Sequence, residues 1–125
     1  MKYIIFLTLI LNACSFIFSE DNLNSVKENV ESGKAILIDT RSPREWNQGH
    51  IHGARRYEVS DLRKLKKSGE LEKTIPKDKI IYTHCMKGVR AKIAADILKE
   101  RGYDVRPLKE GYTDLIKAGL QNAAD

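Results

Sequence analysis

The sequence has little cysteine, no apolar run long enough to span a membrane, and no low-complexity tract or internal repeat. Its 125 residues include 2 cysteines, Cys14 and Cys85, which excludes a disulfide-dense scaffold. The apolar stretch at the N-terminus, residues 3–18, is shorter than the roughly 20 apolar residues that a membrane span needs. The 42% hydrophobic and 31% charged residues are typical of a globular domain, and the length fits one.

The first residues are typical of a secretory signal peptide. Lys2 supplies the positive start, and the apolar run Tyr3–Leu11 follows it. Cleavage after Ser19 is one prediction: it makes residues 1–19 the signal peptide and residues 20–125 the folded domain.

A second cleavage site is equally open. Leu11-Asn12-Ala13-Cys14 resembles the lipobox of bacterial lipoproteins, in which the cysteine becomes the lipidated first residue. An uncleaved anchor is the third alternative. We expect an exported, periplasmic domain whose contact with a membrane is limited to a lipid on Cys14.

Either cleavage leaves Cys85 as the single thiol of the folded domain. In an oxidising compartment structural cysteines normally occur in pairs. An unpaired cysteine there is either tolerated because it is buried or retained because it is reactive.

The net charge of +5 does not predict nucleic-acid binding. The densest basic segment is Arg63–Lys67, and Leu62 and Leu65 give it an apolar face. That pattern is typical of a solvated helix, and no aromatic residues interleave with the cations. We expect no nucleic-acid partner.

Short apolar runs alternate with segments of helical periodicity, which predicts an α/β fold: a central parallel sheet with helices on both faces. In chain order we expect a helix at 22–32, a strand at 35–38 ending in Asp39, a loop at 40–54, a short strand at 57–59, a helix at 61–67, a strand at 80–82 ending at Cys85, a helix at 88–101, a strand at 105–108 and a helix at 111–119.

Two chemically capable residues follow the two most apolar strands. Asp39 comes directly after the first and Cys85 closes the second. Ligands of parallel α/β sheets bind beyond the carboxyl ends of the strands. We therefore expect both residues at one edge of the sheet, and the site there.

The chain leaves a strand and enters a helix within Met86-Lys87-Gly88-Val89-Arg90. Gly88 permits a tight turn, in which successive N–H groups form an anion cradle at the positive end of the helix. A cysteine in this setting, beside Lys or Arg, has its pKa lowered from about 8.5 to ~3.5–7.5. The alternative is an inert, buried cysteine that merely ends the strand.

Two motifs resemble those of the rhodanese domain. Residues 85–90 match the six-residue active loop C-x-x-G-x-[RT]. The pattern D-x-R-x-x-x-E-[YFW]-x-x-G-H-I-x-G-A appears at positions 39–54, and the resemblance continues to Gly102-Tyr103 and Glu110-Gly111-Tyr112. The sequence departs from the family at Ala91, where a hydroxyl residue is common, and at Arg55, where a proline is usual. The family's opening strand before the first helix is not evident.

The resemblance implies a single rhodanese-like domain with thiosulfate sulfurtransferase activity. Cys85 would be the nucleophile and would carry the sulfur as a persulfide to cyanide or to a thiol. Met86, Lys87, Gly88, Val89 and Arg90 would bind the donor. A cation at position 87 is typical of members that prefer thiosulfate. No cofactor is implied.

Asp39 is expected to support the active loop by accepting hydrogen bonds, and Arg41 and Glu45 are expected to form a structural ion pair. His50 belongs to the second motif and is a further supporting residue. The spacing of His50, His52 and His84 is weak evidence for a metal, and we expect none. His84 should point away from Cys85, because strand neighbours alternate in direction.

Two other functions remain open. Phosphatases and arsenate reductases that resemble rhodaneses have a longer C-x5-R loop, whereas Cys85 to Arg90 is C-x4-R. A non-catalytic module that presents a persulfide or docks a partner is the third hypothesis, although such domains often lack the cysteine that is present here.

Overall fold

The computed structural model describes residues 18–124, in which four parallel strands form one sheet in the order β2-β1-β3-β4. The elements are α1 (Leu23–Glu31), β1 (Ala35–Asp39), α2 (Pro43–Gln48), β2 (Arg55–Arg56), α3 (Val59–Ser68), α4 (Leu71–Thr74), β3 (Ile80–His84), α5 (Val89–Lys99), β4 (Val105–Pro107) and α6 (Tyr112–Lys117).

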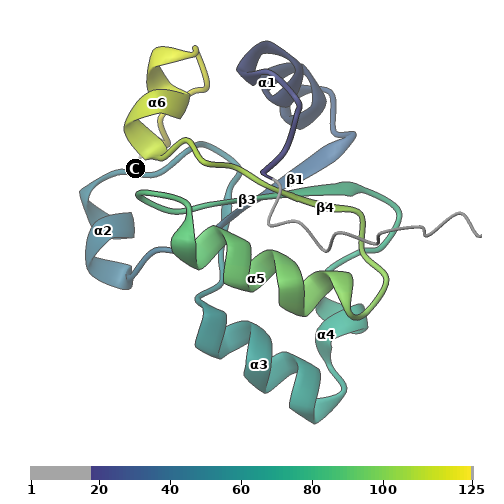
Figure 1. Ribbon diagram of the computed structural model, residues 1–125. Coiled ribbons are helices and arrows are strands. Elements are labelled where there is room, and N and C mark those ends of the chain that lie inside the picture. The colour runs from purple at the N-terminus through teal and green to yellow at the C-terminus, as the bar shows by residue number, and fades with distance from the viewer. Residues whose placement is uncertain (1–17, 125) are drawn as a thin grey trace, which may run out of the picture.

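Helices cover both faces of the sheet, as the alternating pattern predicts. Helices α1 and α6 lie on one face and α3 and α5 on the other (Figure 1). Each of β1 and β3 is flanked by a strand on both sides, and their residues are almost all buried, which explains why both read as continuous apolar runs. The predicted fold class is confirmed.

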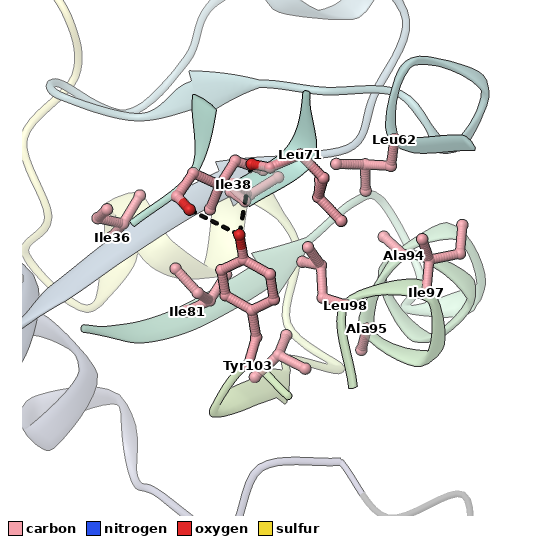
Figure 2. Close-up of a cluster of buried hydrophobic side chains, with 12 residues drawn as sticks. Ile36, Ile38, Leu62, Leu71, Ile81, Ala94, Ala95, Ile97, Leu98 and Tyr103 are labelled. Atoms are coloured by element: carbon pink, nitrogen blue, oxygen red, sulfur yellow. Dashed lines mark hydrogen bonds between the residues drawn. The ribbon is translucent and has the colours of Figure 1, made fainter. Parts of the chain in front are cut away.

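Two apolar clusters form the core, one on each face of the sheet. Ile36, Ile38 and Ile81 pack against α3 and α5 on one face, whereas Leu37 and Tyr82 pack against α1 and α6 on the other. This alternation is the two-residue period of a strand. Figure 2 shows the first cluster, in which the buried Tyr103 hydroxyl donates to the Ile75 carbonyl at 2.6 Å.

Two sequence predictions about local structure are wrong, and one helix was missed. The expected loop at 40–54 contains α2, which Ser42 caps by accepting from the Glu45 N–H while the Glu45 carboxylate accepts from the Ser42 N–H. Such a capping box stabilises a helix too short to show periodicity. The strand expected at 57–59 is instead β2 at 55–56, since Val59 begins α3. Helix α4 was not expected.

The N-terminal segment joins the domain through Phe18 and Ser19. The Ser19 N–H donates to the Pro107 carbonyl at 2.7 Å, and the Phe18 ring lies under the Lys92 ammonium at 4.7 Å. No strand precedes α1 within residues 18–124, and none of the helices there is long and apolar enough to cross a membrane. The lipobox at Cys14 and most of the expected signal peptide lie outside the described residues.

Candidate active site

Cys85 lies at the carboxyl-terminal edge of the sheet, directly after β3. The register of β1 and β3 pairs Asp39 with His84, so the ends of the two strands are level. The Thr40 N–H and hydroxyl both donate to the His84 carbonyl at 2.9 Å, which locks this edge together. The two chemically capable residues therefore lie at one edge, as the sequence predicts.

The cysteine thiol is held inside its own loop. Its sulfur accepts the Gly88 N–H at 3.1 Å, and the side chain is 1% exposed. Gly88 caps α5 with φ of 92°, a left-handed conformation that favours glycine. The donated Gly88 N–H and the positive end of the 11-residue helix therefore both face the sulfur, an arrangement that can hold an anion.

Arg90 is bound to α2 and does not point freely into the loop. Its two terminal nitrogens contact the Glu45 carboxylate at 2.7 and 3.1 Å. The hydrogen bonds from Arg90 lower the pKa of Glu45 to about 2, with smaller contributions from Ser42, against burial that raises it. The pKa of Arg90 is raised first by Glu45 and then, more weakly, by the Cys85 sulfur. The guanidinium thus ties residues 85–90, which we call the cysteine loop, to α2.

The expected ion pair between Arg41 and Glu45 does not form. Arg41 turns back onto Asp39, and its Nη2 lies 2.8 Å from the Asp39 carboxylate. Asp39 also accepts the Arg41 backbone N–H at 2.9 Å, so it supports the turn after β1 and not the cysteine loop directly. Glu45 already accepts hydrogen bonds from Ser42 and Arg90. Arg41 therefore pairs with Asp39, the carboxylate that the fold places beside it.

A small cavity of about 110 Å³ opens beside the sulfur. Its walls are formed by the turn after β1, the cysteine loop and the start of α6, and the lining residues are Arg41, Cys85, Met86, Gly111, Tyr112, Thr113 and Asp114. The Arg41 guanidinium lies 4.9 Å from the centre of the Tyr112 ring. A larger cavity of about 550 Å³ lies near the start of β1, so size alone does not identify the active site.

Gly111 packs against the cysteine loop, at a position where a side chain would not fit. A Cβ there would lie 2.5 Å from the Met86 carbonyl oxygen and 2.9 Å from that of Cys85, closer than backbone atoms tolerate. The segment before α6 therefore packs directly against the loop. The sequence motif Glu110-Gly111-Tyr112 marked this segment, but nothing in the sequence alone connected it to the cysteine.

His50 and Trp46 affect the site indirectly, through the turn at Gly49. Their rings stack with centroids 3.6 Å apart, and the His50 Nδ1 lies 2.9 Å from the Trp46 carbonyl. This contact shapes the turn at Gly49, whose carbonyl accepts the Arg41 Nη2 at 2.7 Å. Within residues 18–124 no cluster of His, Cys, Asp and Glu has the geometry to hold a metal ion.

His84, the last residue of β3 and the neighbour of Cys85 in the chain, is fully buried. Its ring lies on the same face of the sheet as Asp39, and neither ring nitrogen has a hydrogen-bond partner among the described residues. The Nε2 is 3.6 Å from the Asp39 carboxylate, which is the spacing of an ion pair. Burial nevertheless outweighs that attraction and lowers the pKa of His84 to about 4. At neutral pH the contact therefore joins a neutral imidazole to a carboxylate.

These features match one family of domains. The model of the rhodanese-like domain matches residues 22–118. The chain belongs to the rhodanese-like domain family.

Two relatives agree with that assignment, but the match covers very different shares of their own length. The uncharacterized protein YqhL of Bacillus subtilis is 33% identical over 108 residues, which are 83% of this chain and 81% of that protein. The tRNA uridine(34) hydroxylase of Staphylococcus carnosus is 35% identical over 86 residues, 68% of this chain, but the match spans only 27% of the hydroxylase. Its whole-protein activity therefore does not transfer with the domain.

A solved structure carries the same fold. The human single-domain sulfurtransferase TSTD1 superposes with a TM-score of 0.65 at 24% identity, covering 76% of this chain and 92% of that one. Sulfurtransferases are thus among the proteins that share this rhodanese fold.

Acidification should destabilise the protein through His84. The folded-state pKa of about 4 lies below the unfolded value of about 6.5, so the unfolded chain binds the extra proton first. This contribution to stability is complete above pH 6.5 and is lost as the pH falls towards 4. Between pH 8 and pH 5 we expect a loss of about 2 kcal/mol, measured by urea unfolding.

The matched variants are His84→Gln and His52→Gln. The first should flatten the pH dependence of the unfolding free energy above pH 5. The second changes an exposed histidine and should keep the wild-type dependence. Equal slopes for wild type and His84→Gln would contradict the assignment to His84.

Proposed function

We propose that the protein is a thiosulfate sulfurtransferase that carries sulfur on Cys85. The observation that supports this most is the hydrogen bond from the Gly88 N–H to the Cys85 sulfur at 3.1 Å, made at the N-terminus of α5. The same cradle would hold the terminal sulfur of a persulfide. The family relationship supports the same class of reaction.

The chemistry proceeds in two displacements. The Cys85 thiolate attacks the outer sulfur of thiosulfate, the S–S bond of the donor breaks, and sulfite leaves with the electron pair. Cyanide or a thiolate then attacks the outer sulfur of the Cys85 persulfide, and the electron pair of that S–S bond returns to Cys85. No external oxidant or reductant is required, and the covalent intermediate gives ping-pong kinetics.

The first displacement brings a dianion to an anion. At about 4 Å and an effective dielectric near 20, each pair of unit charges costs about 4 kcal/mol. Arg90 is paired with Glu45, which reduces the part of its charge that can offset the repulsion at the Cys85 sulfur. Lys87 is exposed, and no ion pair within residues 18–124 includes it. Lys87 is therefore the cation best placed to receive the thiosulfate.

The length of the loop argues against phosphatase chemistry. Between Cys85 and Arg90 there are four residues, one fewer than the resemblance implies for a loop that wraps a tetrahedral oxyanion. The bidentate contact of Arg90 with Glu45 further withdraws the guanidinium from the position where it would bind a phosphate. Both observations favour sulfur transfer.

We also propose that the exported chain begins at Cys14. Phe18 packs against Gly88 of the cysteine loop, and the Ser19 N–H is bonded to Pro107. Cleavage after Ser19 would discard both contacts, whereas cleavage before Cys14 keeps them. These contacts support the lipoprotein prediction, with the domain held at the periplasmic side of a membrane by its lipid.

Wild-type protein should convert thiosulfate and cyanide to thiocyanate, and Cys85→Ser should abolish the reaction because the nucleophile is lost. Thiocyanate is read colorimetrically. Intact-mass spectrometry after thiosulfate treatment should show one added sulfur on the wild type and none on the variant. Equal turnover by the two proteins would refute the proposal.

Lys87→Ala should lower kcat/KM for thiosulfate by roughly tenfold, about 1.4 kcal/mol. The effect should shrink at high salt, since salt screens an exposed charge, and it should be smaller for an uncharged sulfur donor. Lys64→Ala, on the exposed side of α3, is the matched control and should keep the wild-type rate. Unchanged thiosulfate turnover of Lys87→Ala at low ionic strength would refute the role of Lys87.

Processing is tested on protein exported by a bacterial host. Intact mass should correspond to a chain that starts at Cys14 and carries a lipid, and Cys14→Ser should prevent lipidation. A mature chain that starts at Glu20 would show that the contacts of Phe18 and Ser19 are dispensable and that the other cleavage site is used.

A further inference from the structure

The exposed large hydrophobic side chains of residues 18–124 all lie within eight positions of Cys85. They are Met86 at 59%, Val89 at 66% and Ile93 at 38% exposure. Val89 and Ile93 are four residues apart on α5 and so occupy the same side of the helix. We call these three residues the apolar face. Single exposed apolar residues are ordinary, but a group beside the nucleophile marks a contact surface.

The cations around the apolar face give it a charge preference. Lys87 lies in the loop itself, and the Cα of Lys109 is 3.4 Å from the position of a Cβ on Gly88. Both side chains are exposed. Asp96, three residues beyond Ile93, ends the apolar face on the helix. A partner that covers this surface must therefore combine apolar side chains with acidic ones.

The burial of the Cys85 sulfur determines how an acceptor can reach it. Cys85 is 1% exposed, and the cavity beside it is only about 110 Å³. Cyanide reaches such a site by diffusion and makes no use of Val89 or Ile93. A cysteine on a protein must be guided into the loop, and a surface contact next to the loop provides that guidance.

We propose that the apolar face docks a protein sulfur acceptor whose reactive cysteine is flanked by apolar and acidic residues. This inference rests on the proposed sulfurtransferase function and names its acceptor. The acceptor thiolate attacks the outer sulfur of the Cys85 persulfide, the S–S bond to Cys85 breaks, and the Cys85 thiolate is regenerated as the acceptor becomes the persulfide. Three side chains make a small contact, as in transient complexes that must separate after each transfer.

The test uses defined acceptors. One short synthetic peptide carries a central cysteine between leucines and glutamates, a second has serines in place of the leucines, and 2-mercaptoethanol is the small thiol. Wild-type protein loaded with thiosulfate should transfer sulfur to the leucine peptide with a kcat/KM about tenfold above that for the serine peptide, because burying leucine side chains stabilises the encounter. Equal rates with the two peptides would overturn the proposal.

Ile93→Ser probes the apolar face without altering the cysteine loop. It should lower kcat/KM for the leucine peptide about fivefold and leave turnover with cyanide and 2-mercaptoethanol unchanged. Lys99→Ser, at the far end of α5, is the matched control and should behave as wild type. An Ile93→Ser variant that keeps the wild-type rate with the leucine peptide would overturn the proposal.

Binding measured without chemistry separates this inference from the function. A fluorescent form of the leucine peptide with serine in place of its cysteine should bind wild type more tightly than Ile93→Ser. If thiosulfate fails to load Cys85 while this difference persists, the sulfurtransferase proposal fails and the docking face stands. Sedimentation that shows a wild-type dimer, dissociated by Ile93→Ser, would assign the face to a second copy of the chain and overturn the proposal.

Discussion

The site depends on the pairing of β1 with β3. Their register places Asp39 opposite His84, and Thr40 fastens the two strand ends through the His84 carbonyl. A shift of one residue would turn every side chain of a strand to the other face of the sheet. The His84 ring would then point to the face that its neighbours in the strand now occupy, and Cys85 would be misplaced. Ile36, Ile38 and Ile81 pack in one cluster and Leu37 and Tyr82 in the other, so the packing of these side chains in the core positions Cys85.

Arg41 and Arg90 hold two different parts of the site in place. Arg41 closes the turn after β1 by binding Asp39 and the Gly49 carbonyl, and Arg90 joins the cysteine loop to α2 through Glu45. Both pairs are charge-assisted and bidentate or multiply bonded, which adds geometric precision to the attraction. The loop is thereby held from the side of α2, by Gly111 on another side and by α5 behind it. These contacts, all made by the protein's own residues, hold the loop in place, as the proposed reaction would require.

The surroundings of Cys85 divide into an inner and an outer part. Inside are the Gly88 N–H, which donates to the sulfur, and the small cavity. Outside, Lys87 and the apolar face present charge and hydrophobic surface to the solvent. The inner part accounts for the proposed reaction with thiosulfate. The outer part accounts for the proposed preference for a protein acceptor, because only a large acceptor would contact it.

The sequence by itself determined the α/β class, the two buried strands, the helix after Gly88 and the position of Cys85 at the sheet edge. These follow from local patterns: apolar runs, helical periodicity, and a glycine at a strand-to-helix turn. Only the tertiary structure decided that Arg41 pairs with Asp39 and Arg90 with Glu45, that Gly111 must pack on the loop, and that the His84 ring is buried with no hydrogen-bond partner among residues 18–124. The contact of Arg90 with Glu45 and the packing of Gly111 join segments far apart in the chain. Arg41 and Asp39 are only two residues apart, but their pairing depends on which carboxylates the fold places within reach of Arg41. Strand register and helix placement decide this geometry, and no local pattern specifies them.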